Sequence, residues 1–120
     1  MDEKRDEFDS GAVRDSKKGK GRFDLVSPIA IKEIALVAEE GINNSKYPLR
    51  NWEKGIPLSS FLDSFQRHLN NHLMGMTDEK HLSRALWNMQ ALVHTYEMIQ
   101  LGKLSNILND LPNYSDERKV

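Results

Sequence analysis

The sequence predicts one small all-α domain, a short helix bundle of three main helices. Three segments between residues 26 and 102 carry apolar residues at the spacing of one helix face. Glycine and asparagine separate these segments, and none alternates apolar and polar residues as a strand would. The 120 residues leave room for one thin core, which favours a homo-oligomer that completes a larger bundle.

The amino-acid composition argues against several classes of function. The chain has no cysteine, which removes disulfides, thiolate metal sites and cysteine nucleophiles. Its net charge of -1 argues against general nucleic-acid binding, which usually needs a basic surplus. No apolar run is long enough to cross a bilayer, and the charged N-terminus lacks a signal region. We therefore expect a cytoplasmic protein that does not contact a membrane.

The first part of the chain changes from acidic to basic. Residues 1–10 form an acidic tail, and a basic, glycine-rich stretch follows. Its cations are Arg14, Lys17, Lys18, Lys20 and Arg22. This stretch is either a solvated tail or a basic arm that folds over an anionic ligand such as a phosphate. We expect a single helical domain over residues 11–114, with a basic N-terminal arm, and a C-terminal tail over residues 115–120.

The first helix is expected to begin at Pro28, because Ser27 can cap it and proline suits the first helical position. Gly41, followed by two asparagines, is expected to end it. Glu39 lies closer to the apolar face of this helix than Glu40. A carboxylate there is either solvated or completes a magnesium site, since magnesium prefers oxygen ligands.

Residues 45–57 are expected to form an ordered loop after the first helix. Proline and glycine break regular structure here, yet several residues are too apolar for an idle linker. The loop therefore packs down as a lid or a wall. Lys46 and Arg50 beside Trp52 suit a nucleotide, with phosphate held by charge and the base held by stacking. Trp52 is equally suited to plugging the core.

The second helix is expected from Ser59 or Ser60 to Met74, with a capping box between Ser60 and Asp63. Asp63 and Arg67 are four residues apart, so they form an ion pair along the helix unless Arg67 reaches a phosphate. The third and longest helix is expected to start at a Thr77 cap and to end at Gly102. Asp78 and Glu79 would then lie in its first turn, where a helix favours negative charge. One more short helix is expected over residues 104–108.

Polar side chains gather near the turn between the second and third helices. His68 and His72 share the apolar face of the second helix, either as core or interface histidines or as an inward pair. The turn adds Asp78, Glu79 and His81. Carboxylates and imidazoles from two elements suit a divalent-metal site or an acid–base pair, although HExxH is absent. Asn88, seven residues after His81, holds either a ligand base or a neighbouring side chain.

A set of residue strings resembles a known family. The strings are Gly11-Ala12-Val13-Arg14-Asp15, Gly19-Lys20-Gly21-Arg22-Phe23-Asp24-Leu25, Lys46-Tyr47, Arg50-Asn51-Trp52-Glu53-Lys54-Gly55, Asp63-Ser64, Arg67-His68-Leu69, Asp78-Glu79-Lys80-His81-Leu82, Ala85-Leu86-Trp87-Asn88 and Asp110-Leu111-Pro112-Asn113-Tyr114. In this order the chain resembles the bacteriophage family named for the dATP/dGTP diphosphohydrolase N-terminal domain. The resemblance runs from about Gly11 to Tyr114.

The resemblance implies a compact helical protein that handles purine deoxynucleotides in the cytoplasm of a phage-infected host. All-α MazG-like pyrophosphohydrolases, which are distantly similar, use clustered helix carboxylates to bind Mg²⁺ while water attacks the phosphate chain. Here Asn43 and Asn44 stand where those enzymes carry a second acidic residue, and no ExxD pair follows on the third helix. This departure favours a second hypothesis, a protein that binds a nucleotide or sequesters a nucleotide signal without catalysis. A third is a purely structural helical interaction module.

The first hypothesis is a nucleotide pyrophosphohydrolase that acts on purine (deoxy)nucleoside triphosphates. Its metal ligands for Mg²⁺ are Glu39, Asp78 and Glu79. Its catalytic group is His68, His81 and Glu79, with a histidine positioning water or acting as acid–base. Its nucleotide-binding residues are Arg14, Lys20, Arg22, Lys46, Arg50, Asn51, Trp52, Arg67 and Asn88. It requires the basic arm, the tryptophan loop and the turn before the third helix to converge on one anion-sized cavity, within one subunit or between two.

Overall fold

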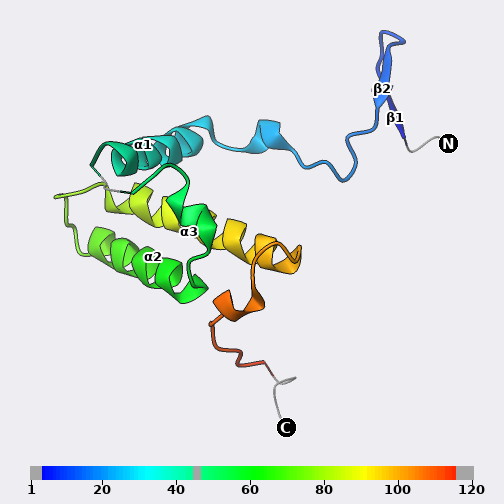
Figure 1. The fold of residues 1–120 in the computed structure, drawn as a ribbon. Coiled ribbons are helices and arrows are strands. Elements are labelled where there is room, and N and C mark those ends of the chain that lie inside the picture. The colour runs from blue at the N-terminus through cyan, green and yellow to red at the C-terminus, as the bar shows by residue number, and fades with distance from the viewer. Residues whose placement is uncertain (1–3, 45–46, 116–120) are drawn as a thin grey trace.

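The computed structural model describes residues 4–44 and 47–115, and three helices form its body (Figure 1). They are α1 (Pro28–Asn44), α2 (Leu58–Leu73) and α3 (His81–Gln100). α3 contacts both other helices and lies between them. Short 3-10 helices lie at Phe23–Leu25, Asn51–Lys54 and Asn106–Leu108. The expected all-α bundle of three main helices is confirmed, with an ordered segment after the first helix.

One small element was not expected, an antiparallel hairpin of β1 (Arg5–Glu7) and β2 (Val13–Asp15). The register pairs Arg5 with Asp15 and Asp6 with Arg14, so opposite charges face each other across the strands. Each strand contains both signs of charge, and this pairing explains the hairpin although neither strand alternates apolar and polar residues. The hairpin stands apart from the helices, at the end of an extended arm (Figure 1).

α1 begins and ends where the sequence predicts. The Ser27 hydroxyl accepts a hydrogen bond of 3.1 Å from the Ala30 backbone N–H, which confirms the expected cap. The helix ends at Asn44, within the expected end signal of Gly41 followed by Asn43 and Asn44, although Gly41 itself lies inside the helix. Gly41 does not take the left-handed conformation that ends a helix. A glycine inside a helix costs only about 1 kcal/mol relative to alanine, so its neighbours can carry the helix through.

Polar contacts hold α1 against α3. Glu33 accepts hydrogen bonds from the Ser83 hydroxyl, at 2.7 Å, and from the Lys80 ammonium, at 2.9 Å. These bonds hold the pKa of Glu33 below its usual value, Ser83 being the larger cause. About two turns further along α1, the Glu40 carboxylate accepts a hydrogen bond from Arg84. No residue of α1 is fully buried, so these contacts set its position as much as apolar packing does.

α2 begins at Leu58 and uses a distant cap. The capping box expected between Ser60 and Asp63 is not formed, because Ser60 lies inside the helix and its N–H donates to the Pro57 carbonyl. Instead Asp110 accepts a hydrogen bond of 2.9 Å from the Ser59 N–H and a second from the Ser59 hydroxyl. The C-terminal segment is thereby tied to the start of α2.

α3 begins at His81, four residues later than the expected Thr77 cap. Gly75, with a φ of 81°, ends α2, and the Met76 N–H donates to the Asn71 carbonyl. The residues after Gly75 form the turn that leads the chain to α3. Asp78 and Glu79 therefore lie in the connecting turn rather than in the first turn of the helix.

The core lies between α2 and α3. Its buried apolar side chains are Leu58, Phe61, Ala85, Ala91 and Ile99. Two polar residues of α3, His81 and Thr95, are buried with them, and the Thr95 hydroxyl donates to the Ala91 carbonyl at 2.8 Å. Leu82, the apolar neighbour of His81, is 52% exposed. The buried face of α3 therefore passes through His81 and Ala85 rather than through Leu82, and this places His81 inside.

Among the described residues, no helix is both long and apolar enough to span a membrane. The cytoplasmic location expected from the sequence stays a prediction.

Leu58 is fully buried at the start of α2. Replacement by alanine should lower the free energy of unfolding by about 2–5 kcal/mol, because it removes buried methyl groups and leaves a cavity. Urea denaturation followed by circular dichroism measures this loss. Leu73→Ala is the control, since Leu73 on the same helix is 75% exposed and its loss should be small. Equal losses in the two variants would contradict the placement of the core.

The Asp110–Ser59 contact should make stability depend on pH. The Ser59 hydroxyl, and then its N–H, hold the pKa of Asp110 below its usual value. A carboxyl with a lower pKa in the folded state stabilises it above the unfolded pKa, and the gain is lost as pH falls through the folded pKa. The Tm advantage of wild type over Asp110→Asn should thus be constant near pH 7 and shrink below about pH 4. A constant advantage at every pH would show that the ionised carboxylate is not the cause.

Candidate functional site

A cavity of about 570 Å³ opens between α1, the segment that follows it, and α3. One end of α1 supplies small and apolar walls through Val37, Ala38, Gly41 and Ile42. The following segment supplies Tyr47, Pro48, Leu49, Arg50, Asn51 and Trp52. His68 of α2 and Arg84, Trp87 and Asn88 of α3 complete the lining. A largely apolar hollow with a few polar groups at one side is the usual form of a small-molecule site.

Edge-to-face ring contacts fix the aromatic wall. The Trp52 and Trp87 centroids lie 5.6 Å apart at 71°, and Trp52 meets His94 at 4.9 Å and 66°. The ring centroids of Trp87 and the buried Phe61 lie 6.5 Å apart, also edge to face. These contacts anchor both indoles to the core, so the cavity presents preset aromatic surface on which a planar ring can stack.

Arg84 is the principal cation of the cavity wall. Its Nη2 donates to Glu40, and its Nε lies 3.7 Å from the Glu79 carboxylate. Within the described part of the chain, this Nε is buried and has no hydrogen-bond partner. The nearest acceptor to this buried Nε is the Glu79 carboxylate, while the guanidinium as a whole borders the cavity and gives it a positive wall. Arg84 is therefore suited to a phosphate.

Asn88 and Arg50 border the same cavity. Asn88 donates through Nδ2 to the Arg84 carbonyl at 2.9 Å, a bond that does not use its side-chain oxygen. Arg50 has a φ of 60°, a left-handed conformation that is uncommon outside glycine, and its guanidinium pairs with Glu53 at 2.7 Å. Such strained positions gather at ligand sites.

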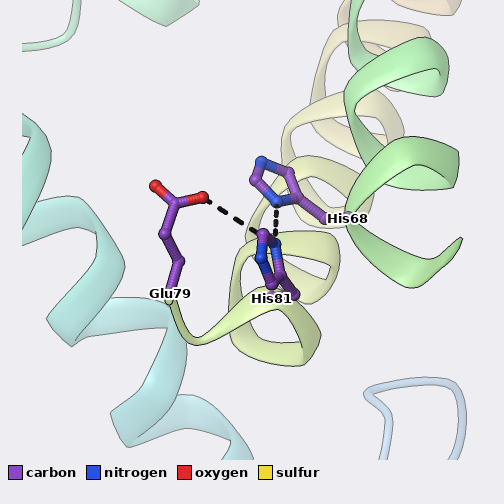
Figure 2. A group of neighbouring side chains, drawn as sticks. All are labelled: His68, Glu79 and His81. Carbon is purple, nitrogen blue, oxygen red and sulfur yellow. Dashed lines mark hydrogen bonds and ion pairs between the residues drawn. The ribbon is translucent and has the colours of Figure 1, made fainter. Parts of the chain in front are cut away.

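A group of two histidines and a carboxylate lies beside the cavity (Figure 2). Nδ1 of His68 is 2.9 Å from Nδ1 of His81, and a Glu79 oxygen lies 3.8 Å from that same His81 nitrogen. Nε2 of His81 contacts the Asp78 carboxylate at 2.9 Å. His81 is 3% exposed, whereas His68 is half-buried and also lines the cavity. This group therefore connects the helix turn to the cavity.

The charges around this group follow from its contacts. Burial lowers the pKa of His68, while the negative charge of Glu79 opposes the change. His68 is therefore neutral at pH 7, as a proton acceptor or metal ligand must be. The hydrogen bond from His81 holds the pKa of Asp78 below its usual value, so its carboxylate stays ionised.

The structure brings together part of the expected site. Arg50, Asn51, Trp52, His68 and Asn88 all line the cavity. Glu79 and His81 adjoin it through His68 and Arg84. The tryptophan loop and the turn before α3 thus converge, as the sequence predicts.

Other expected residues lie elsewhere. Arg14 and Lys20 line a separate hollow on the arm, together with Val13, Asp15 and Lys17. Arg22 pairs with Asp24, and Arg67 with Asp63. Glu39 is exposed and contributes to neither the cavity nor the histidine group, while His72 is also exposed. Lys46 falls outside the described residues. Within one subunit the basic arm therefore does not reach the cavity.

Sequence reasoning missed Arg84, Trp87 and Tyr47 as wall residues. A signal for Arg84 was present, since it stands three residues after His81 and four before Asn88 on one helix face. Trp87 stands three residues after Arg84, and only the packing of Trp52 against it shows that it belongs to the wall.

Comparison with known proteins gives one match. No curated protein and no solved structure is significantly similar to this chain. Residues 10–103, most of the chain, match the family described as dATP/dGTP diphosphohydrolase, N-terminal. This match includes the whole cavity wall and the histidine group. The chain therefore belongs to the dATP/dGTP diphosphohydrolase N-terminal family.

Proposed function

We propose that this protein binds a purine deoxynucleoside triphosphate, dATP or dGTP, and hydrolyses it to the monophosphate and pyrophosphate. The observation that carries the proposal is a cavity that presents two anchored indoles together with the guanidinium of Arg84. Cation and aromatic rings in one hollow match a phosphate chain and a base. The family description names the same substrates.

Each wall residue has a role in this proposal. Trp52 and Trp87 stack against the base, and the side-chain oxygen of Asn88 accepts a hydrogen bond from an amino group on it. Arg84 and Arg50 neutralise the phosphates. Both adenine and guanine carry an exocyclic amino group, so an acceptor at this position is compatible with either base.

His68 is the residue placed to activate water, because it lines the cavity and its ring is neutral at pH 7. The water oxygen bonds to the α-phosphorus, the bond from that phosphorus to the bridging oxygen breaks, and pyrophosphate leaves with the electron pair. His68 takes the proton that the water loses. Arg84 stabilises charge that builds on the phosphate oxygens.

Mg²⁺, the cofactor expected from the sequence, stays part of the proposal as the ion that accompanies the triphosphate. Of the three carboxylates expected to hold it, Glu79 adjoins the cavity wall, 3.7 Å from Arg84. Asp78 contacts the far nitrogen of His81, and Glu39 lies apart from both. Glu79 is therefore the residue that would hold Mg²⁺, which would neutralise the phosphate charge.

The position of these carboxylates favours a second candidate function, nucleotide binding without cleavage. MazG-like catalysis relies on several clustered carboxylates, whereas among the described residues Glu40, Glu53 and Glu79 reach this cavity only as partners of its wall arginines, and no carboxylate lines it. A protein of this kind would sequester the nucleotide intact. A purely structural module, the third candidate, gives the aromatic and cationic lining of the cavity no role.

Thermal shift with dATP and dGTP, with and without Mg²⁺, tests binding. Ligand at a hundred times its Kd should add about 2.7 kcal/mol of stability. Arg84→Gln should weaken binding about 10- to 100-fold, since a hydrogen bond to a charged group contributes roughly 1.5–3 kcal/mol. Lys32→Ala, an exposed cation on α1 outside the wall, is the control and should bind as wild type does.

Chromatography of the nucleotide after heat denaturation separates the candidates. Recovery of dAMP or dGMP with pyrophosphate supports the enzyme, and His68→Gln should then stop cleavage while the nucleotide still binds. Recovery of intact triphosphate from a protein that it stabilised supports sequestration. If no nucleotide shifts the Tm, both the enzyme and the sequestration candidates are contradicted and only the structural module is left.

We also propose that the chain forms a homo-oligomer through the outer face of α1 and the arm before it. Phe23, Leu25 and Ile29 are 85%, 73% and 76% exposed, although all three are large and apolar. Exposed apolar clusters of this kind mark association sites. A second copy is the natural occupant, because association of copies would also give the cations of one arm access to the cavity of another.

Light scattering after size exclusion measures this association. Wild type should elute as a dimer or larger species, and Ile29→Glu should shift it to monomer, because a charge cannot be buried there without a partner. Ile107→Glu is the control, since Ile107 is 85% exposed at a different site. A wild-type monomer at high concentration would refute the proposal.

A further inference from the structure

The histidine group surrounds a single point. Ligand atoms of His68, Glu79 and His81 all lie within 4.8 Å of one another, and two imidazole nitrogens face each other at 2.9 Å (Figure 2). Two nitrogens at about 2.1 Å from one tetrahedral metal ion are about 3.4 Å apart. The two rings would therefore need to separate by about half an ångström to share an ion, and the half-exposed Glu79 needs only a small movement to join them.

Asp78 orients the buried ring. An ionised carboxylate only accepts hydrogen bonds, so Nε2 of His81 is the donor in its 2.9 Å contact with Asp78. In the neutral ring, Nδ1 then carries the lone pair, and it points towards His68 and Glu79. Protein metal sites use this arrangement, in which a carboxylate holds the far nitrogen of a histidine ligand and fixes its tautomer.

The donor set selects the class of metal. Two imidazole nitrogens and one carboxylate oxygen suit Zn²⁺ and neighbouring transition-metal ions, whereas Mg²⁺ prefers oxygen ligands alone. Three protein ligands leave at least one coordination position open, as in catalytic rather than structural zinc sites. His68 belongs both to this group and to the cavity wall, so the open position lies beside the cavity.

We propose that His68, Glu79 and His81 bind one transition-metal dication of the Zn²⁺ class, with Asp78 as the positioning residue behind His81. The inference deepens the proposed function, since an ion there would lie next to the phosphate-binding Arg84 and supply Lewis-acid chemistry. With the ion bound, the lone pair of His68 would hold the metal, so activation of water would rest on the ion and no longer on His68 as a base. Binding of the ion requires no nucleotide and can be measured alone.

Isothermal titration of the full-length protein, first stripped with a chelator, tests the site. Zn²⁺ without nucleotide should bind at one ion per chain and raise Tm, and Mg²⁺ at the same concentration should do neither. Co²⁺ should bind at the same site and absorb visible light there. Added Zn²⁺ should displace the Co²⁺ and remove this absorption. The coordination geometry can be read from the intensity of that absorption.

Two substitutions test the ligands. Glu79→Gln and His68→Gln should each weaken Zn²⁺ binding at least tenfold, since each removes one of three ligands while leaving the buried His81 in place. His72→Gln is the matched control, because His72 lies one turn further along α2 and is exposed. It should bind Zn²⁺ as wild type does. Circular dichroism of each variant checks the fold, and His81→Gln is avoided because His81 is part of the core.

Three results would overturn the proposal. They are no stoichiometric Zn²⁺ binding by wild type, unchanged binding in both ligand variants, or an equal loss in His72→Gln, which would indicate adventitious surface binding. The first would leave a plain hydrogen bond between the two histidines. Failure here is separable from failure of the proposed function, because nucleotide binding through Arg84 is scored in different assays.

Discussion

The burial of His81 is the constraint on which the site depends. An imidazole with both nitrogens out of water needs a partner for each, and the fold supplies Asp78 on one side and His68 on the other. Satisfying both fixes the path of the turn and the register of α2 against α3. Glu79, between Asp78 and Lys80, is thereby held beside the rings rather than in a helix.

α3 carries this constraint from the turn to the cavity. Arg84 and Asn88 follow His81 at helical spacing, so the same face that buries the imidazole presents a guanidinium and an amide to the cavity. Arg84 also pairs with Glu40, which makes it both a wall residue and a link to α1. The histidine group and the cavity are therefore adjacent because one rigid helix spaces them, and a change at either alters the other through Arg84 and Glu79.

Much of this architecture could be predicted from local patterns. Apolar spacing indicated three helices, Ser27 before Pro28 indicated the start of α1, and Trp52 indicated that its loop packs inward. Features that rest on distant partners could not be predicted in this way. Asp110 caps α2 from 51 residues away, and no local rule singles it out.

The start of α3 also depends on distant partners that local sequence patterns do not reveal. Thr77 has the residue type of a cap, and local propensity alone would start the helix there. The tertiary partners of His81 take precedence and delay the start to His81 itself. The sequence therefore predicted which residue types gather at this turn, but not the distances between them. Those distances depend on how α2 packs against the turn, which is determined only in the folded chain.

The thin core leaves α1 weakly attached to the rest of the fold. α1 has no fully buried residue, and its hold on α3 rests largely on Glu33 and Glu40. An element held this weakly gains most from whatever bridges it to the rest of the fold. A nucleotide in the cavity would do so, because the end of α1, the tryptophan loop and α3 each provide part of the wall. A bound nucleotide would therefore stabilise the position of α1, and since the exposed apolar face of α1 is the proposed contact between copies, nucleotide should strengthen association as well.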